Sequence, residues 1–359
     1  SMIHVRNSAQ RNLDAERFNE SFMMHTSTSP HYGVIAACDV ASKMMEGDAG
    51  RSLVQEMHDE AIAFRRAMLH VRDDLGREDW WFSVWQPTQV ERSLDKGDTP
   101  APLVAKREEW YLQPDGHWHG FENLVGDYVL IDPIKVTLLT PGLSMDGSMG
   151  RLGIPAAVLS KFLWSRGITV EKTNLYSVLF LFSMGITKGK WSTLVTELMA
   201  FKELYDRNAP LSQALPTLAA DYPVAYAGWG LRDLCDALHA FNQEFAVAKV
   251  MREMYVDLPT PVMTPADAYN HLVKGEIERV DIEQISGRIA ATMLVPYPPG
   301  IPTIMPGERF GASDEPIIQS LRIAREQNAR FPGFESDVHG LIIEHDGDGV
   351  SYRVEVLKA

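Results

Sequence analysis

A loop of consecutive hydroxyl residues is the first feature of the sequence that could do chemistry. Thr26, Ser27 and Thr28 stand together shortly before Pro30, and a run of small hydroxyl residues closed by proline is typical of a loop. Their hydroxyls and backbone N–H groups are hydrogen-bond donors that suit a phosphate dianion. The alternative is structural, because Ser and Thr commonly cap a helix, here the one expected after Pro30. The residues alone leave both alternatives open.

Other signatures of catalytic or metal chemistry do not occur in the sequence. His117 and His119 have the spacing of a pair on one face of a strand, but nothing nearby supplies further ligands, so we expect no metal. Residues 185–190 (GITKGK) have the wrong spacing for a phosphate-binding loop, and Trp191 follows where Ser or Thr would be needed. The sequence also contains no GxGxxG, GxSxG or HExxH motif.

The composition is that of an ordinary globular protein with an acidic surplus. The chain has 359 residues, of which 45% are hydrophobic, and a net charge of −14; this length predicts two or three domains. The negative field repels phosphate backbones, so we expect no nucleic-acid partner. Cys38 and Cys235 lie far apart, which indicates reduced thiols and a cytoplasmic location. The most apolar stretch, residues 176–186, is too short to span a bilayer, so we expect no membrane partner.

Hydrophobic periodicity and turn signals predict the elements that must position these residues. The predicted helices are 13–24, 33–45, 51–75, 155–166, 191–205, 231–241, 246–254, 266–273 and 315–328. The predicted strands are 2–5, 80–85, 128–139, 168–171, 176–184, 338–344 and 352–357. Residues 91–116 predict a loop, and the proline-rich segment 296–302 predicts a rigid turn. Changes along the chain in the kinds of predicted element predict domain boundaries near residues 47 and 207.

The segment that contains the hydroxyl loop, residues 18–30 (FNESFMMHTSTSP), closely resembles a segment of the bacterial ornithine/lysine/arginine decarboxylases. Further segments resemble that family in order along the chain: 118–121 (WHGF), 132–137 (DPIKVT), 153–156 (GIPA), 170–173 (VEKT), 179–183 (LFLFS), 296–302 (PYPPGIP), 305–308 (MPGE), 331–335 (FPGFE) and 337–340 (DVHG). The resemblance covers essentially the whole chain. Residues 183–191 (SMGITKGKW) are most similar to pseudomonad-type lysine decarboxylases.

The resemblance implies an aspartate-aminotransferase fold with α/β and α+β parts. Residues 1–46 would end the cofactor-binding large domain, 47–206 would form an α+β small domain, and 207–359 a mixed, helix-rich C-terminal domain. The implied activity is decarboxylation of a basic amino acid with pyridoxal phosphate, lysine being favoured over arginine and ornithine. The family's Schiff-base lysine lies in a Ser-x-His-Lys motif that does not occur here. The resemblance therefore implies a C-terminal half whose catalytic lysine lies upstream.

The resemblance also assigns cofactor-binding residues. In similar enzymes the hydroxyl loop reaches the cofactor phosphate of the neighbouring subunit, so Thr26, Ser27 and Thr28 are expected to bind pyridoxal phosphate, with Ser27 favoured. The implied partners are the N-terminal half of the enzyme and a second copy of the chain, in a homodimer with a shared active site. The family often stacks such dimers into larger rings.

Glu171 is the candidate substrate-binding residue, because the glutamate at this place in similar enzymes contacts the side-chain amine of the substrate. The alternative is a surface charge paired with Lys172 or Lys135. The family often continues Thr-Gly-Pro-Tyr, whereas residues 173–176 here are Thr-Asn-Leu-Tyr. That departure, beside the candidate residue, weakens the transfer of substrate preference.

A second class of function is a non-catalytic binding or assembly module derived from that family. It would apply if the 359 residues were the whole chain, because the Schiff-base lysine would then be missing. The predicted first strand, residues 2–5, argues against it, since an unpaired strand is a poor folding unit.

Overall fold

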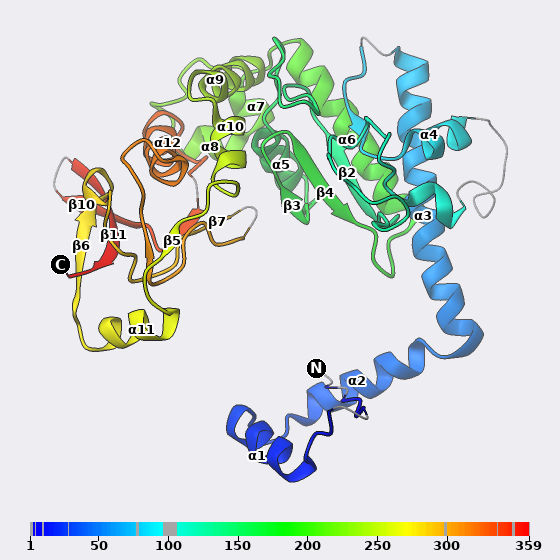
Figure 1. The fold of residues 1–359 in the computed structure, drawn as a ribbon. Coiled ribbons are helices and arrows are strands. Elements are labelled where there is room, and N and C mark those ends of the chain that lie inside the picture. The colour runs from blue at the N-terminus through cyan, green and yellow to red at the C-terminus, as the bar shows by residue number, and fades with distance from the viewer. Residues whose placement is uncertain are drawn as a thin grey trace. The chain divides into compact units, whose positions relative to one another are not determined.

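A computed structural model describes residues 3, 5–8, 11–27, 29–76, 79–95, 106–297, 300–335, 337–346 and 349–358. The chain divides into two compact units between Glu56 and Met57, inside the long helix α3 (Gly47–Leu75) (Figure 1). The fold is mixed α/β, as predicted, with many helices and several small antiparallel sheets. None of the described helices combines the length and the apolar character that crossing a lipid bilayer requires.

Two short helices make up most of the first unit. Helix α1 (Ala15–His25) begins at Asp14, whose side chain accepts a hydrogen bond from the Arg17 N–H at 2.9 Å. Helix α2 (Tyr32–Met44) begins at His31, whose Nδ1 accepts from the Val34 N–H. Both helices were predicted, within two residues at each end. Neither buries a residue within the described chain.

The strand predicted at residues 2–5 is wrong where it can be checked. Ser1, Met2 and His4 lie outside the described residues, and neither Ile3 nor Val5 belongs to a strand. A strand needs a hydrogen-bonded neighbour, and the described part of the chain supplies none to these two residues.

The central sheet of the second unit is antiparallel, with the order β1-β2-β4-β3. Its strands are β1 (Ser83–Val84), β2 (Lys135–Leu139), β3 (Lys172–Thr173) and β4 (Ser177–Leu181). Helices α5 (Ala156–Ser165) and α6 (Lys188–Asp206) lie alongside this sheet (Figure 1). Alternate residues such as Val136, Leu138 and Val178 are fully buried in the main core, as the period of two in a half-buried strand requires.

Two predictions in this region are wrong in detail. The strand predicted at 168–171 is displaced to β3, because the Ile168 N–H is still bonded to the Leu163 carbonyl at the end of α5. The loop predicted over residues 91–116 contains most of helix α4 (Thr88–Asp95) and a 3₁₀ turn at Arg107–Trp110; residues 96–105 lie outside the described chain. Val90 and Leu94 are one helical turn apart and are buried with Trp110, which is why a charged segment still forms a helix.

Helices dominate the second unit from residue 207 to residue 273, as predicted, and strands become more frequent after that. From residue 207 onward the helices are α7 (Leu211–Ala214), α8 (Pro216–Asp221), α9 (Leu231–Glu244), α10 (Val247–Glu253), α11 (Pro265–Val273) and α12 (Pro316–Arg330). A short 3₁₀ turn covers Ile282–Gln284. The strands are β5 (Thr260–Pro261), β6 (Ile277–Asp281), β7 (Val295–Tyr297), β8 (Glu308–Arg309), β9 (Asp337–His339), β10 (Ile342–Asp346) and β11 (Gly349–Leu357).

These strands form three small sheets, ordered β10-β11-β6, β5-β8 and β7-β9. The proline-rich segment predicted as a rigid turn begins in β7, where Pro296 pairs with Val338 of β9; Pro298 and Pro299 lie outside the described residues. Three apolar clusters lie among the described residues of the second unit: one around the central sheet, one around the three-stranded sheet, and the smaller one that contains Val90, Leu94 and Trp110. The domain boundaries near residues 47 and 207 stay predictions.

Candidate functional site

The hydroxyl loop lies in the first unit, between α1 and α2. Thr26 is the residue that ends α1, and its Oγ1 donates a hydrogen bond to the Phe22 carbonyl at 2.9 Å. The Ser27 Oγ accepts from the Ser29 N–H at 3.1 Å, and its contact with the Ser29 carbonyl is long, at 3.4 Å. Both side chains are exposed, and Thr28 lies outside the described residues. Ser27 therefore presents a weakly engaged hydroxyl at the surface.

The described hydroxyl residues of this loop do not cap the helix that follows Pro30, which was the structural alternative. Helix α2 is capped by the His31 side chain. Thr26 instead bonds back to α1, and Ser27 bonds within the loop. The loop fits a phosphate group in chemistry, because an exposed Ser hydroxyl and a short polar turn can supply donors to an anion.

Glu171 lies in the second unit, at the bend before β3. Its backbone N–H donates to the Leu179 carbonyl at 2.9 Å, which ties it to β4. Its side chain is exposed. Among the described residues no salt bridge joins it to Lys172 or Lys135, the partners considered for a surface charge. The carboxylate is thus available to a cation from outside this part of the chain.

The strand after Glu171 is held firmly. Lys172 and Thr173 pair with Leu179 and Val178 of β4, and the Thr173 and Ser160 hydroxyls lie 2.6 Å apart. This contact joins β3 to α5, so the backbone beside Glu171 is fixed by both a strand and a helix. A carboxylate on such a support needs little reorganisation to bind a cation.

The two histidines near residue 118 do not form a cluster with other ligands. His119 is buried, its Nε2 lies 2.9 Å from the Gln113 carbonyl, and its Nδ1 accepts from the Phe121 N–H at 3.0 Å. Both ring nitrogens are therefore used to hold the loop. Among the described residues, no group of three or more His, Cys, Asp or Glu side chains could hold a metal ion.

Sequence reasoning missed a buried polar network beside the loop that precedes α5. The Tyr176 hydroxyl lies 2.6 Å from His239 Nδ1, and His239 Nε2 lies 2.8 Å from the Gly150 carbonyl. Asn242 Nδ2 donates to the Tyr176 hydroxyl at 3.0 Å. Burial raises the pKa of Tyr176 to about 12. Tyr176 matches the tyrosine that ends the family's Thr-Gly-Pro-Tyr run, but nothing in the sequence connects it to His239.

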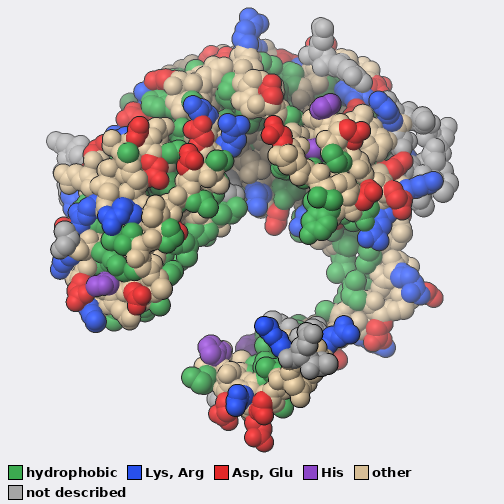
Figure 2. All heavy atoms as spheres, viewed as in Figure 1, with side chains coloured by type: hydrophobic (Ala, Val, Ile, Leu, Met, Phe, Trp, Pro, Cys, Tyr) green, Lys and Arg blue, Asp and Glu red, His purple; other side chains and the backbone are tan. Residues whose placement is uncertain are grey.

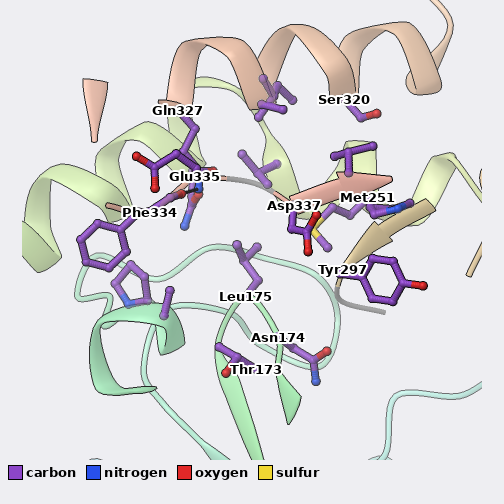
Figure 3. A pocket seen from close by; sticks show the side chains of 18 of the residues that line it. Thr173, Asn174, Leu175, Met251, Tyr297, Ser320, Gln327, Phe334, Glu335 and Asp337 are labelled. Atoms are coloured by element: carbon purple, nitrogen blue, oxygen red, sulfur yellow. Dashed lines mark hydrogen bonds between the residues drawn. The ribbon is translucent and has the colours of Figure 1, made fainter. Parts of the chain in front are cut away.

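A cavity of about 410 Å³ lies next to this network in the second unit (Figure 3). Residues from α5, α9, α10 and α12 line it, together with the turn after β3 and strands β7 and β9. Four motifs that had no chemical assignment contribute to its wall: 153–156, 296–302, 331–335 and 337–340. These motifs mark parts of the wall, but nothing in the sequence shows that they enclose one cavity.

Two models of one protein family match two separate ranges of this chain. The model for the major domain of Orn/Lys/Arg decarboxylases matches residues 1–190, and the model for their C-terminal domain matches residues 248–358. Lysine decarboxylase LdcA of Pseudomonas aeruginosa is 57% identical over 358 residues, which is 100% of this chain and 46% of that protein. The biodegradative arginine decarboxylase of Escherichia coli is 40% identical over 100% of this chain and 48% of its own length.

Solved structures show the same likeness. Lysine decarboxylase A from Pseudomonas aeruginosa superposes with a TM-score of 0.89 at 57% identity, over 97% of this chain and 45% of that one. The constitutive lysine decarboxylase of Escherichia coli superposes with a TM-score of 0.85 at 39% identity, over 97% and 46% of the two chains. The chain thus spans about half the length of the relatives that it matches.

Proposed function

The chain belongs to the Orn/Lys/Arg decarboxylase family, and from this we propose that it is the C-terminal part of an enzyme that decarboxylates a basic amino acid, with lysine favoured. One observation carries the proposal: the major-domain model matches residues 1–190, a range that includes both the hydroxyl loop and Glu171. Lysine is favoured because the relative with 57% identity is a lysine decarboxylase, while arginine and ornithine decarboxylases match at 40% and 35%.

The proposed cofactor is pyridoxal phosphate, which supplies the electron sink for loss of carbon dioxide when it is bound. Ser27, with Thr26 and Thr28, is the proposed contact for its phosphate. The exposed Ser27 hydroxyl supports this, because it can exchange its long contact with the Ser29 carbonyl for an anionic acceptor, and a charge-assisted bond is shorter and stronger. The residue that attaches the cofactor is proposed to lie outside this chain.

Glu171 is proposed to bind the distal ammonium group of the substrate. An ionised carboxylate accepts hydrogen bonds from an ammonium group, and a bond of this kind is worth about 1.5–3 kcal/mol. The absence of a salt bridge to Glu171 among the described residues supports this role, because no intramolecular cation has to be displaced. The contact orients the substrate by its far end and leaves its reacting end free.

The proposed partners are the N-terminal half of the enzyme and a second copy of the chain, in a homodimer with a shared active site that can stack into a larger ring. The first unit supports such docking, because its apolar side chains are exposed: Met24 to 81%, Tyr32 to 78%, and Val34, Ile35 and Val40 to more than half. Apolar surface on this scale is typical of an interface. A cytoplasmic location is proposed with it.

Over the face shown in Figure 2, acidic and basic side chains are interspersed. With a net charge of −14, the protein attracts a cationic amino acid better than a nucleic acid.

Product analysis tests the proposed function. The intact protein, supplied with pyridoxal phosphate, is offered lysine, arginine and ornithine in separate reactions, and carbon dioxide and the amine are measured. We expect release of carbon dioxide with one basic amino acid strongly preferred, and pentane-1,5-diamine from lysine. A protein that binds no pyridoxal phosphate and releases no carbon dioxide from any of the three would instead be the non-catalytic binding or assembly module.

A further inference from the structure

We propose that the cavity between α5, α10, α12 and β9 is a binding site for a small organic ammonium ion with an apolar chain. Its volume of about 410 Å³ lies within the range of about 300–1,000 Å³ that is usual for small-molecule pockets. The inference does not rest on the proposed decarboxylation, because it uses neither the hydroxyl loop nor Glu171. Three observations carry it: the hydrogen-bonding state of the lining, its charge, and its apolar wall.

The first observation concerns Asn242, which lines the cavity and is only 4% exposed. The Gly150 carbonyl can only accept, so His239 Nε2 donates to it and His239 Nδ1 is the acceptor for the Tyr176 O–H. The Tyr176 oxygen can then accept from Asn242 Nδ2. This chain of bonds fixes the amide and leaves the Asn242 Oδ1 as an acceptor for a ligand.

Other polar residues of the lining also donate a hydrogen bond within the protein and keep an oxygen as an acceptor. Gln327 Nε2 donates to the Phe334 carbonyl at 2.7 Å, which leaves its Oε1 as an acceptor. The hydroxyls of Ser320 and Thr303 donate to the carbonyls of Ile317 and Leu294, so that they too can only accept further bonds. The side-chain oxygens of these lining residues are thus left as acceptors, and an ammonium ion can satisfy such oxygens with its three donors.

The second observation is the charge of the lining. Figure 3 shows Asp337 projecting into the space bounded by Leu175 and Met251, with Glu335 farther along the same segment. Among the described residues no salt bridge joins either carboxylate to a cation. Lys161 also lines the cavity, but its Nζ lies over the Phe334 ring, 5.1 Å from the centroid. Two carboxylates therefore face one lysine, so the site favours a cation.

The third observation is the apolar wall, to which Leu175, Val250, Met251 and Leu321 contribute. Apolar side chains favour burial of an alkyl chain, because each CH₂ group that leaves water adds to the binding free energy. Leu175 and its neighbour Asn174 stand where similar enzymes often have Pro and Gly. The departure from the family pattern thus gives this cavity a longer apolar side chain at Leu175 and an additional amide at Asn174.

Calorimetric titration of the intact protein with pentan-1-amine tests the site, with pentan-1-ol as the neutral probe of the same chain length. We expect the amine to bind at least about tenfold more tightly than the alcohol, since a charge-assisted bond is worth at least about 1.4 kcal/mol. Asp337→Asn should weaken amine binding about tenfold. The matched control Asp115→Asn removes the same charge from an exposed turn outside the lining and should change nothing.

The methyl resonance of Met251 shows where the amine binds, because Met251 lines the cavity. With protein labelled at the Met methyl carbon, this resonance should shift at the same amine concentration in the unmodified protein and in Glu171→Gln, and only at about tenfold higher amine concentration in Asp337→Asn. Equal affinity for alcohol and amine would overturn the proposal. So would amine binding that Glu171→Gln abolishes and Asp337→Asn leaves intact, although that result would support the proposed substrate site. If the protein decarboxylates none of the three amino acids but binds the amine as expected, the proposed function fails and the proposed ammonium site stands.

Discussion

The hydroxyl of Tyr176 and the Nδ1 of His239 lie 2.6 Å apart in the core of the second unit, 63 residues apart in the chain. Tyr176 stands immediately before β4, and His239 lies in α9, so this bond ties the central sheet to a helix of the following segment. His239 continues the network to the Gly150 carbonyl. Because each member is buried, the loss of one would leave its partners unsatisfied.

Removal of the Tyr176 hydroxyl should therefore destabilise the protein. Tyr176→Phe leaves His239 Nδ1 and Asn242 Nδ2 without their partner, and an unsatisfied buried group costs about 1–3 kcal/mol. Denaturant unfolding should show a lower midpoint with an unchanged slope. The control is Tyr128→Phe, at a side chain that is 80% exposed, and equal stability losses in the two variants would show that the network contributes nothing.

The same tyrosine should give the protein a specific sensitivity to alkali. Burial raises its pKa to about 12, from an ordinary value of 10. Between pH 10 and pH 12 the unfolded tyrosine loses its proton while the folded one keeps it, so unfolding releases a proton and the free energy of unfolding falls as the pH rises. Below pH 10 this contribution is fully present.

Tyr176→Phe lacks this ionisation, so its free energy of unfolding should fall less steeply than that of the unmodified protein across the same interval. Unfolding curves at several pH values between 9 and 12 provide the measurement. Tyr205 and Tyr226, whose pKa values burial also raises, contribute equally to both proteins and cancel in the difference. Parallel pH profiles would contradict the assignment to Tyr176.

Close packing around His239 makes a separate prediction at Gly153. A Cβ atom added to Gly153 would lie 1.9 Å from His239 Nδ1, a distance that requires the imidazole or the loop to move. Gly153→Ala should destabilise the protein by about 1–3 kcal/mol, as overpacking of a core does. Gly189→Ala is the matched control, because its added Cβ would meet only Thr187 Oγ1, at 3.9 Å. Thermal unfolding of the two variants distinguishes a packed glycine from a tolerant one.

Patterns within a single segment of the sequence predicted those helices and strands that the segment itself specifies. The β-like run at residues 128–139 contains strand β2, and Pro155, expected in the first turn of a helix, lies one residue before the start of α5. Strand β6 was missed because its sequence, Ile-Glu-Arg-Val-Asp, is mostly charged, and only pairing with β11 makes it a strand. Non-local pairing of this kind leaves little trace in sequence.

The functional residues, too, could be predicted where a continuous motif marks them and not where only the fold brings them together. The hydroxyl loop and Glu171 could be selected because each lies in a continuous motif that resembles a known family. The cavity could not be predicted, because Asn242 and Asp337 face it from segments that only the folded chain brings together. The hydrogen bonds that turn Asn242 into an acceptor depend on Tyr176 and His239, and no spacing in the sequence indicates them.

Ser27 is predicted to act on cofactor affinity. Ser27→Ala removes one hydroxyl from the loop, and a lost hydrogen bond to a charged group costs about 1.5–3 kcal/mol, or about 10- to 150-fold in the dissociation constant of pyridoxal phosphate. Equilibrium dialysis with absorbance detection of the cofactor measures this. Ser42→Ala is the control in the same unit, because the Ser42 hydroxyl is bonded to the Cys38 carbonyl within α2. Normal cofactor affinity in Ser27→Ala would remove Ser27 from the proposed site.

Glu171 is predicted to act on substrate affinity instead. Glu171→Gln keeps the shape of the side chain but replaces a charged acceptor by a neutral amide, so KM for lysine should rise about 10- to 150-fold for a contact worth about 1.5–3 kcal/mol. Cofactor affinity should stay unchanged, because the substituted group contacts the far end of the substrate. Steady-state kinetics with lysine, together with the dialysis measurement, separates the two effects. Glu122→Gln changes an exposed glutamate of the same unit and should leave KM unaltered, whereas an unchanged KM in Glu171→Gln would mean that the substrate ammonium group is bound elsewhere.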